Sequence, residues 1–373
     1  MKLEKLVIFY PSFERGGVEL ILVNLINFFL KKKVKICLIT SNFNKKQITN
    51  NKLFSLKEVE GPSKNFINNR IIKSLYAVKS LFNELKNSNP KNTMVFSLQS
   101  SALSIILSKT LNYKIVVRNA EDPLYSTFYK ENKFIAFLVL SLKILTYNFA
   151  DGLITNSKGS KESLKKILFK KQNFDYIYNP YLKKINKKNR LTRKKYILSV
   201  GRLTKQKDFS NLIFSFSLIA NQIPEYKLVI VGGGNLKTEL IKLRNKLGLK
   251  NKIIFTGWKK NIDKYYKYAS IYVLPSLYEG LGNVVIDAVN FEIPTIVTDC
   301  KSGPNEIILK NRGGYIVPKS NSKLMAKKII YVIKNYNEAK NKILFAKKNI
   351  NRFLCETNSL KYLDFLKKVF DGK

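Results

Sequence analysis

The stretch SIYVLPSLYEGLGNVVIDAV (270–289) has the pattern of a buried strand, a glycine-containing loop and a helix. Its apolar start predicts the strand, and Gly282 and Asn283 then lead into the helix, for which Asn283 is a suitable N-cap. Two acids interrupt the apolar residues: Glu279 in the loop, and Asp287 one turn into the helix on the same side as Asn283. Because burying an unpaired carboxylate is unfavourable, both acids either reach solvent or bind something in a cleft.

Segments of the same kind alternate along the whole chain. Short runs rich in Val, Ile, Leu and Phe, separated by helical lengths, indicate parallel βαβ units. The expected strands cover 5–10, 33–40, 93–98, 114–119 and 152–157, and then 196–201, 227–234, 252–258, 270–276, 294–299 and 313–318. The pattern predicts an α/β protein with two doubly wound, Rossmann-like domains facing each other across a cleft. In such sheets, ligands bind at the carboxyl ends of the strands.

A break between the two series of strands sets the expected domain boundaries. Residues 181–195 are polar and strongly basic, which suits a linker. We therefore expect a first domain at 1–180, a second domain at 196–355, and a C-terminal helix at 356–373 that could cross back to the first domain. A chain of 373 residues is long enough for two domains of ordinary size.

Composition limits the classes of function. The formal net charge is +43, from 68 Lys and Arg against 25 Asp and Glu. Codon drift in an AT-rich genome explains much of this excess, and attraction to a polyanion such as a phospholipid surface or a nucleotide phosphate is the functional alternative. The chain has no histidine, which excludes His general bases, Ser-His-Asp triads and the commonest zinc ligand. Since the three cysteines lack metal-ligand spacing, no metal site is expected.

Three segments bear on a possible membrane contact. The start of the chain lacks the long apolar run and the small-residue cleavage site of a signal peptide. The longest apolar run, FIAFLVLSLKIL (134–145), is interrupted by Lys143 and is too short to span a bilayer. The basic and aromatic segment 64–79 fits a surface that rests on anionic lipid, and it fits an ordinary solvated helix face equally well. We expect a cytoplasmic protein with peripheral contact at the inner face of the cell membrane.

A pair of cations forms the second part of the expected site. In SVGRLTKQKDF (199–209), Arg202 comes just after a strand and Lys207 follows five residues later. Two fixed cations at the carboxyl end of a strand suit a diphosphate. A solvated basic loop is the plain alternative in a chain so rich in lysine. Arginine is rare in this chain, which favours a role for Arg202.

Two glycine-rich turns complete the set of motifs. Gly16 and Gly17 link the first expected strand to a helix, where backbone N–H groups can approach an anion closely. The segment KLVIVGGGNLKTEL (227–240) resembles a dinucleotide fingerprint, but Lys237 stands where the third glycine belongs. We therefore interpret it as a turn into a helix.

Together these motifs resemble those of a family 4 glycosyltransferase of the two-domain GT-B type, over essentially the whole chain. The resemblance rests on Gly16-Gly17 with Glu19, on G-R-L-x-x-x-K (201–207), on the triple-glycine turn, on FTGW (255–258), and most strongly on SLYEGLGNVVIDAVNFEIPTIVTDCKSGPNEII (276–308). It implies a retaining, metal-independent enzyme that uses a nucleotide sugar as substrate and needs no cofactor. The last motif is similar to that of enzymes that extend lipid-linked surface glycans, often with N-acetylhexosamines.

The resemblance also implies roles for individual residues. Arg202 and Lys207 neutralise the departing nucleoside diphosphate, and Glu279 holds hydroxyls of the donor sugar. The second acid of the family's E-x7-E motif holds the ribose, and in this chain that acid is Asp287, one methylene shorter than Glu. Further implied donor contacts are Gly16, Gly17, Gly257, Trp258, Gly280, Leu281, Gly282 and Asn283, with the base at 257–258. Arg118 and Asp122, within VVRNAEDP (116–123), are assigned to the acceptor.

The sequence thus predicts a hexosyltransferase of surface polysaccharide, lipopolysaccharide or glycoconjugate synthesis. It would move a hexose or an N-acetylhexosamine from a nucleotide sugar, expected to be a UDP-sugar, to a glycan acceptor expected to be linked to a polyprenyl diphosphate. One alternative is another GT-B sugar-nucleotide enzyme, such as an epimerase or a soluble-acceptor synthase. A basic nucleic-acid-binding protein is suggested only by the charge, and the basic residues are spread along the chain rather than clustered, so no nucleic acid is expected as a partner. An inactive relative is the third alternative, because of Asp287.

Overall fold

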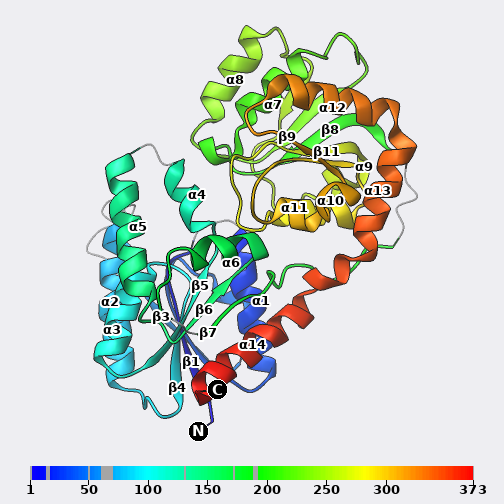
Figure 1. The fold of residues 1–373 in the computed structure, drawn as a ribbon. Helices are drawn as coiled ribbons and strands as arrows, with labels where there is room; N and C mark the ends of the chain where they lie inside the picture. The colour runs from blue at the N-terminus through cyan, green and yellow to red at the C-terminus, as the bar shows by residue number, and fades with distance from the viewer. Residues whose placement is uncertain are drawn as a thin grey trace. The chain divides into compact units, whose positions relative to one another are not determined.

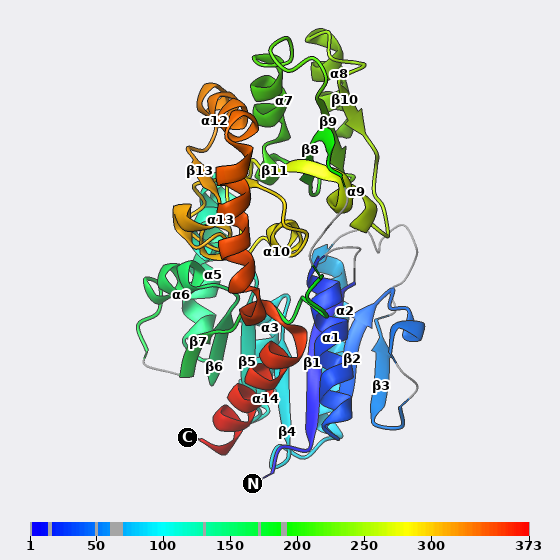
Figure 2. The same cartoon turned by 90° about the vertical axis from the view of Figure 1, so that its right-hand side faces the viewer.

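The computed structural model describes residues 2–13, 17–48, 51–59, 70–129, 132–170, 173–187 and 192–372. The chain divides into two compact units, which Figures 1 and 2 show as ribbons. The first unit contains Met1–Lys183 together with Phe353–Lys373, and the second contains Lys184–Arg352. Each unit is an α/β structure with its own sheet and core.

The first unit is built on a parallel sheet of seven strands in the order β3-β2-β1-β4-β5-β6-β7. The strands are β1 (Lys5–Ser12), β2 (Lys35–Ser41), β3 (Phe54–Glu58), β4 (Thr93–Ser97), β5 (Lys114–Asn119), β6 (Gly152–Thr155) and β7 (Asn173–Tyr176). The helices are α1 (Gly17–Lys31), α2 (Arg70–Lys86), α3 (Ser101–Thr110), α4 (Pro123–Phe128), α5 (Lys133–Tyr147), α6 (Lys158–Lys165) and α14 (Cys355–Asp371). Helices cover both faces of the sheet, so the inner strands are buried along almost their whole length.

The C-terminal helix α14 belongs to the core of the first unit. Its residues Tyr362, Leu366 and Val369 are buried in one cluster with side chains of β1 and β4. The Tyr362 hydroxyl accepts a hydrogen bond of 2.9 Å from Nε of Arg118 on β5. Lys114 Nζ donates to the carbonyl of Phe370 at 2.8 Å, where a cation stabilises the carboxyl end of the helix. The end of the chain therefore completes the fold of the first unit.

The second unit has a parallel sheet of six strands in the order β10-β9-β8-β11-β12-β13. The strands are β8 (Lys194–Val200), β9 (Lys227–Val231), β10 (Ile253–Phe255), β11 (Ala269–Leu274), β12 (Thr295–Thr298) and β13 (Tyr315–Val317). The helices are α7 (Phe209–Ser217), α8 (Lys237–Lys246), α9 (Asp263–Tyr268), α10 (Asn283–Asn290), α11 (Pro304–Ile307), α12 (Ser322–Lys334) and α13 (Tyr336–Lys348). Short 3₁₀ turns are η1 (Lys45–Gln47) in the first unit, and η3 (Lys205–Lys207), η4 (Lys310–Arg312) and η5 (Ile350–Phe353).

Both sheets reverse their strand order at one point, and this point locates the binding edge. In the first unit the reversal falls between β1 and β4, and in the second between β8 and β11. In sheets of this type the connections from the two neighbouring strands leave in opposite directions, and ligands bind at the carboxyl ends of the strands beside such a reversal. The prediction of two parallel, Rossmann-like α/β sheets is confirmed.

The structure also bears on the membrane question. No helix in the described ranges is both long enough and apolar enough to cross a bilayer.

Candidate active site

The loops after β8 and β11 meet at the switch point of the second unit's sheet. Lys207, the last residue of η3, forms an ion pair between its Nζ and Oε1 of Glu279. The side chains are only 11% and 7% exposed, respectively. Because water screens such a pair weakly, each charge strongly fixes the position of the other. Two residues predicted as catalytic from separate motifs are therefore in contact.

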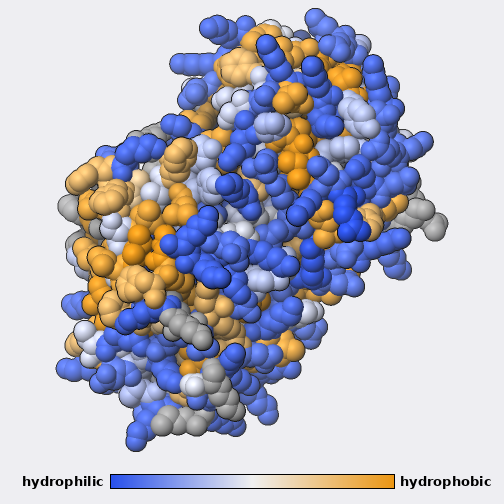
Figure 3. Space-filling view, in the orientation of Figure 1, coloured by the Kyte–Doolittle hydropathy of each residue, from blue (hydrophilic) through white to orange (hydrophobic). Residues whose placement is uncertain are grey.

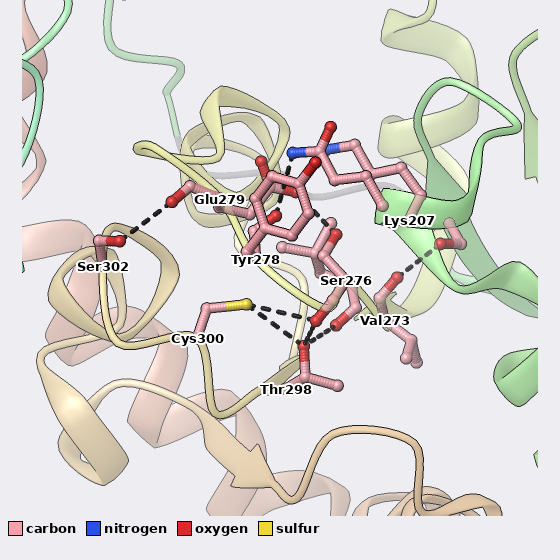
Figure 4. A network of polar contacts seen from close by, with 11 residues as sticks. Lys207, Val273, Ser276, Tyr278, Glu279, Thr298, Cys300 and Ser302 are labelled. Carbon is pink, nitrogen blue, oxygen red and sulfur yellow. Dashed lines mark hydrogen bonds and ion pairs between the residues drawn. The ribbon is translucent and has the colours of Figure 1, made fainter. Parts of the chain in front are cut away.

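Hydrogen bonds from neighbouring loops hold Glu279 in place (Figure 4). The hydroxyl of Ser276 donates to Oε1 of Glu279 at 2.7 Å, and the hydroxyl of Ser302 donates to its backbone carbonyl at 3.0 Å. Gln206 ties the two motifs together, since its side-chain amide donates to the carbonyl of Tyr278 at 3.0 Å and its own carbonyl accepts from Leu277 at 2.8 Å. The carboxylate is thus positioned before any ligand arrives.

Two ionisable side chains near the Lys207–Glu279 pair, Cys300 and Tyr272, stay neutral. Burial raises the pKa of the Cys300 thiol to about 12, and the negative charge of Glu279 adds to the effect. Cys300 Sγ donates to the carbonyl of Ser276 at 3.3 Å. Burial, followed by the charges of Glu279 and Asp287, keeps the pKa of Tyr272 well above its ordinary value. Cys300 and Tyr272 therefore add no charge of their own beside the Lys207–Glu279 pair.

The start of helix α10 differs in one detail from the sequence expectation. Gly282 is the N-cap, in a left-handed conformation with φ of 83°, and Asn283 is the first helical residue. The prediction of Asn283 as N-cap was wrong by one position, because the left-handed turn requires glycine. Asp287 lies one turn into the helix on the same side as Asn283, and both are half-buried. Gly280 and Leu281, between the acid and the helix, are buried.

The loops after β8, β9 and β10 interlock through their backbones. The amide of Gly201 donates to Val231, that of Leu203 donates to Gly233 at 2.9 Å, and that of Gly232 donates to Gly257 at 3.0 Å. A Cβ on Gly232 would lie 1.8 Å from the carbonyl oxygen of Gly201. The triple-glycine turn thus allows the loop that carries Lys207 to pack against its neighbour.

Replacing Gly232 with Ala tests this close approach. Gly232 has φ of +149° in addition to the clash, so we expect a loss of about 3 kcal/mol or more in the free energy of unfolding. Gly248→Ala is the control, because Gly248 has φ of +70° but no atom within 4 Å, and strain alone should cost about 1–2 kcal/mol. Urea unfolding of both variants measures the difference. Equal losses would show that the loops do not depend on this contact.

Two further predicted donor residues lie along the same edge of the sheet. Arg202 lies two residues after the end of β8 and is exposed. Trp258, the only tryptophan of the chain, lies in the loop after β10. Its large aromatic side chain is 53% exposed. Its backbone and Cβ lie within 4.0 Å of the position that a Cβ on Gly233 would occupy. Arg202, the triple-glycine turn, Gly257 and Trp258 therefore belong to adjoining loops.

The predicted donor residues of the first unit are described only in part. Gly16 lies outside the described residues, and Gly17 is the first residue of α1. Glu19, in the first turn of that helix, is buried and accepts a hydrogen bond of 2.9 Å from the Tyr10 hydroxyl on β1. The segment 64–79, predicted to rest on lipid, also falls partly outside, since residues 60–69 are not described.

The two predicted acceptor residues are buried within the first unit. Arg118 is 2% exposed, and besides Tyr362 its guanidinium donates to Oδ1 of Asn179 at 2.5 Å. Asp122 is 0% exposed, caps α4 and accepts a hydrogen bond of 2.6 Å from the Ser163 hydroxyl. Because both side chains are buried, they offer no exposed group for direct contact with an acceptor. Both side chains instead hold the loop after β5, and they could position an acceptor only through it.

Sequence reasoning missed the residues that support Glu279. Ser276 precedes it by three positions inside the quoted stretch, and the pattern S-x-x-E was the available signal. Gln206 and Ser302 gave no signal, because their contacts join loops 72 and 23 residues apart. In the described part of the chain, no group of three or more His, Cys, Asp or Glu side chains lies together as a metal site.

Comparison with known proteins identifies similar sequences. Residues 182–349 match the family model of glycosyl transferases group 1. An uncharacterized glycosyltransferase of Methanocaldococcus jannaschii is 31% identical over 256 residues, covering 64% of this chain and 62% of that protein. An N-acetylgalactosamine-N,N'-diacetylbacillosaminyl-diphospho-undecaprenol 4-alpha-N-acetylgalactosaminyltransferase of Campylobacter jejuni is 28% identical over 372 residues, covering 97% of this chain and 100% of that protein.

Solved structures share the architecture. A mutant of S. aureus TarM, in complex with UDP and sugar ligands, superposes with a TM-score of 0.77 at 14% identity, over 98% of this chain and 99% of that one. The fold and the site therefore define a glycosyltransferase of the GT-B type. Residues 182–349 carry the signature of the glycosyl transferase group 1 family, also called family 4, and the similarity of the whole chain to the Campylobacter enzyme agrees with it. This assignment replaces the nucleic-acid-binding alternative.

Proposed function

We propose that this chain transfers a hexose or an N-acetylhexosamine from a UDP-sugar to a glycan carried on a polyprenyl diphosphate. The observation that carries the proposal is the Lys207–Glu279 pair at the switch point, which offers one group suited to phosphate and one suited to sugar hydroxyls. The name of the Campylobacter relative supports the acceptor, since it includes a diphospho-undecaprenol-linked sugar. The UDP in the TarM complex supports the donor.

Each side chain of the second unit has a proposed role toward the donor. Lys207 and Arg202 neutralise the negative charge that develops on the departing diphosphate. Glu279 accepts hydrogen bonds from sugar hydroxyls, and Asp287 accepts them from the ribose. The exposed ring of Trp258 offers an apolar face to the base. When the donor binds, Lys207 can turn from Glu279 to the phosphate, and Glu279 is then available to the sugar.

The proposed reaction needs no side-chain base. The bond between C1 of the sugar and the diphosphate oxygen breaks while the acceptor oxygen bonds to C1 on the same face, so the configuration is retained. The hydroxyl proton of the acceptor passes to the departing phosphate oxygen. A chain without histidine can perform this step because the leaving group itself takes the proton.

The acceptor is proposed to bind at the carboxyl edge of the first unit's sheet, where strands β1, β4 and β5 end. Arg118 and Asp122 would keep the β5 loop in place there without touching the acceptor. A polyprenyl acceptor is confined to a membrane, so the enzyme is proposed to work at the inner face of the cell membrane.

A thermal-shift series with UDP-, GDP- and ADP-sugars in EDTA tests the donor. A ligand at about 100 times its Kd that binds only the folded state adds about 2.7 kcal/mol, so a UDP-sugar should raise Tm clearly. A shift with GDP- or ADP-sugars alone would contradict the proposed base. Incubation with donor and lipid-linked glycan should release UDP and lengthen the glycan. Conversion of the donor into its epimer, without transfer, would favour the alternative GT-B enzyme.

A further inference from the structure

Helix α5 presents an apolar face to solvent. Its exposed residues are Phe134, Ile135, Phe137, Leu138, Leu142 and Leu145, with exposed fractions between 46% and 70%. Its residues Ala136, Thr146 and Tyr147 are buried against the first unit. A surface helix of a protein in water normally has polar residues on its outer face. The outer face of α5 is apolar instead, which is unusual for a helix in contact with water. A contiguous exposed apolar surface of this kind marks a contact with a partner.

The apolar face extends beyond both ends of the helix. Phe128, at the end of α4, is 66% exposed, and Phe149 and Phe169, after the helix, are 55% and 68% exposed. Figure 3 shows the resulting orange patch on the left of the molecule, where Figure 1 places α4 and α5. We name the surface formed by these three phenylalanines and the six exposed apolar residues of α5 the α5 face.

Lysines lie at both ends of the α5 face, on its aromatic rings. Lys133 Nζ lies 4.9 Å from the centroid of the Phe128 ring, and Lys170 Nζ lies 4.5 Å from that of Phe149. The sequence from 132 to 150 contains no Asp or Glu. Apolar and aromatic side chains flanked by lysines are the pattern of a helix that lies in a membrane interface, with its cations at the headgroups.

From these observations we propose that the α5 face inserts into the surface of an anionic phospholipid bilayer. Charge complementarity selects this partner, because the chain carries a net charge of +43 and each lysine near an anionic headgroup adds attraction. The helix has 15 residues and is about 22 Å long, shorter than the roughly 30 Å hydrocarbon core, so it lies on the membrane and does not span it.

The position of α5 connects the membrane to the acceptor. The helix follows β5 and α4 and runs back toward the start of β6, so its first residues lie on the carboxyl side of the first unit's sheet. A bilayer against the α5 face would therefore adjoin the edge where the acceptor is proposed to bind. In this respect the inference rests on the proposed function, and it narrows the acceptor to one that stays in the bilayer.

Vesicle co-sedimentation of the full chain without donor tests the inference. Wild-type protein should bind vesicles of phosphatidylcholine mixed with phosphatidylglycerol more tightly than vesicles of phosphatidylcholine alone, and less tightly at high salt. Phe134→Gln with Leu138→Gln removes apolar groups without changing charge, and should weaken partition about tenfold to a hundredfold. The matched control is Phe214→Gln with Leu218→Gln, an exposed pair of the same spacing at the end of α7. The control should bind as wild type does.

Three results would overturn the inference. Equal losses in both double variants, or no loss in the α5 variant, would mean that the α5 face does not insert. Sedimentation velocity showing a wild-type dimer that the α5 variant abolishes, with vesicle binding unchanged, would assign the face to a second copy of the chain. The donor-induced rise in Tm separates the two proposals, because it should persist in the α5 variant and would be absent from wild type only if the proposed function is wrong.

Discussion

Replacing Lys207 with Met is expected to lower turnover by roughly a hundred- to a thousandfold, the usual effect of removing one group that stabilises charge in a transition state. Met keeps the length and the apolar stem of the side chain, and only the ammonium group is lost. The donor KM should change less, because the charge on the leaving group grows as the bond breaks. Steady-state kinetics with a saturating acceptor separates kcat from KM.

The same substitution should also destabilise the protein. Glu279 is 6% exposed, and without Lys207 its carboxylate keeps only the hydrogen bond from Ser276 among the contacts within the described ranges of the chain. Leaving one partner of a buried ion pair alone costs about 3–5 kcal/mol, and the remaining hydrogen bond favours the low end. Adding Glu279→Gln to Lys207→Met removes the unpaired charge, so the double variant should regain most of the stability and none of the activity.

Lys205→Met is the matched control for charge. Lys205 lies in the same 3₁₀ turn and is exposed, so its neutralisation tests the effect of net charge in the loop alone. It should leave kcat within about threefold of wild type, as expected for a screened surface charge. If Lys205→Met lowered turnover as much as Lys207→Met, general attraction of the anionic donor would explain the effect, and the buried pair would have no special role.

The sequence predicts every strand of the second unit's sheet and the inner strands of the first unit's sheet, but it misses the two edge strands of the first. Strands such as β4 and β11 are buried on both faces and read as continuous apolar runs, so their alternation with helices was enough to place them. The outer strands β3 and β7, with sequences FSLKE and NFDY, are half-exposed and mixed in composition, and no strand was predicted there. An edge strand of such mixed composition is specified by pairing with its neighbour, which a local pattern does not contain.

For the candidate site too, local sequence indicated individual residues but not the contacts between them. Glu279, Lys207 and Asp287 could be selected because each is a charged residue at the carboxyl end of a strand or the start of a helix. That Lys207 and Glu279 touch could not be predicted, since it depends on β8 and β11 being neighbours in the sheet. Arg118 and Asp122 were chosen by resemblance, and their burial by tertiary contacts with Tyr362 and Ser163 could not be predicted from the sequence.

Glu279→Gln and Asp287→Asn should separate the two acids by their kinetics. Glu279 lies beside Lys207, where bonding changes, whereas Asp287 lies one turn into α10 and is proposed to hold the ribose, which does not react. Interactions that strengthen in the transition state affect kcat, and uniform ones affect KM. Glu279→Gln should therefore lower kcat by roughly ten- to a thousandfold, equivalent to about 1.5–4 kcal/mol. Asp287→Asn should chiefly raise the donor KM.

The conservative change at the second acid completes the test. Asp287→Glu restores the residue usual in the family and should keep or lower the donor KM, because the longer side chain reaches the same hydroxyls. It also addresses the alternative of an inactive relative: if wild type is inactive and Asp287→Glu gains turnover, the lost methylene is the cause. Loss of kcat in Asp287→Asn with an unchanged kcat in Glu279→Gln would reverse the two roles. If neither substitution changed the kinetics, the Lys207–Glu279 pair would be a contact that only holds two loops together.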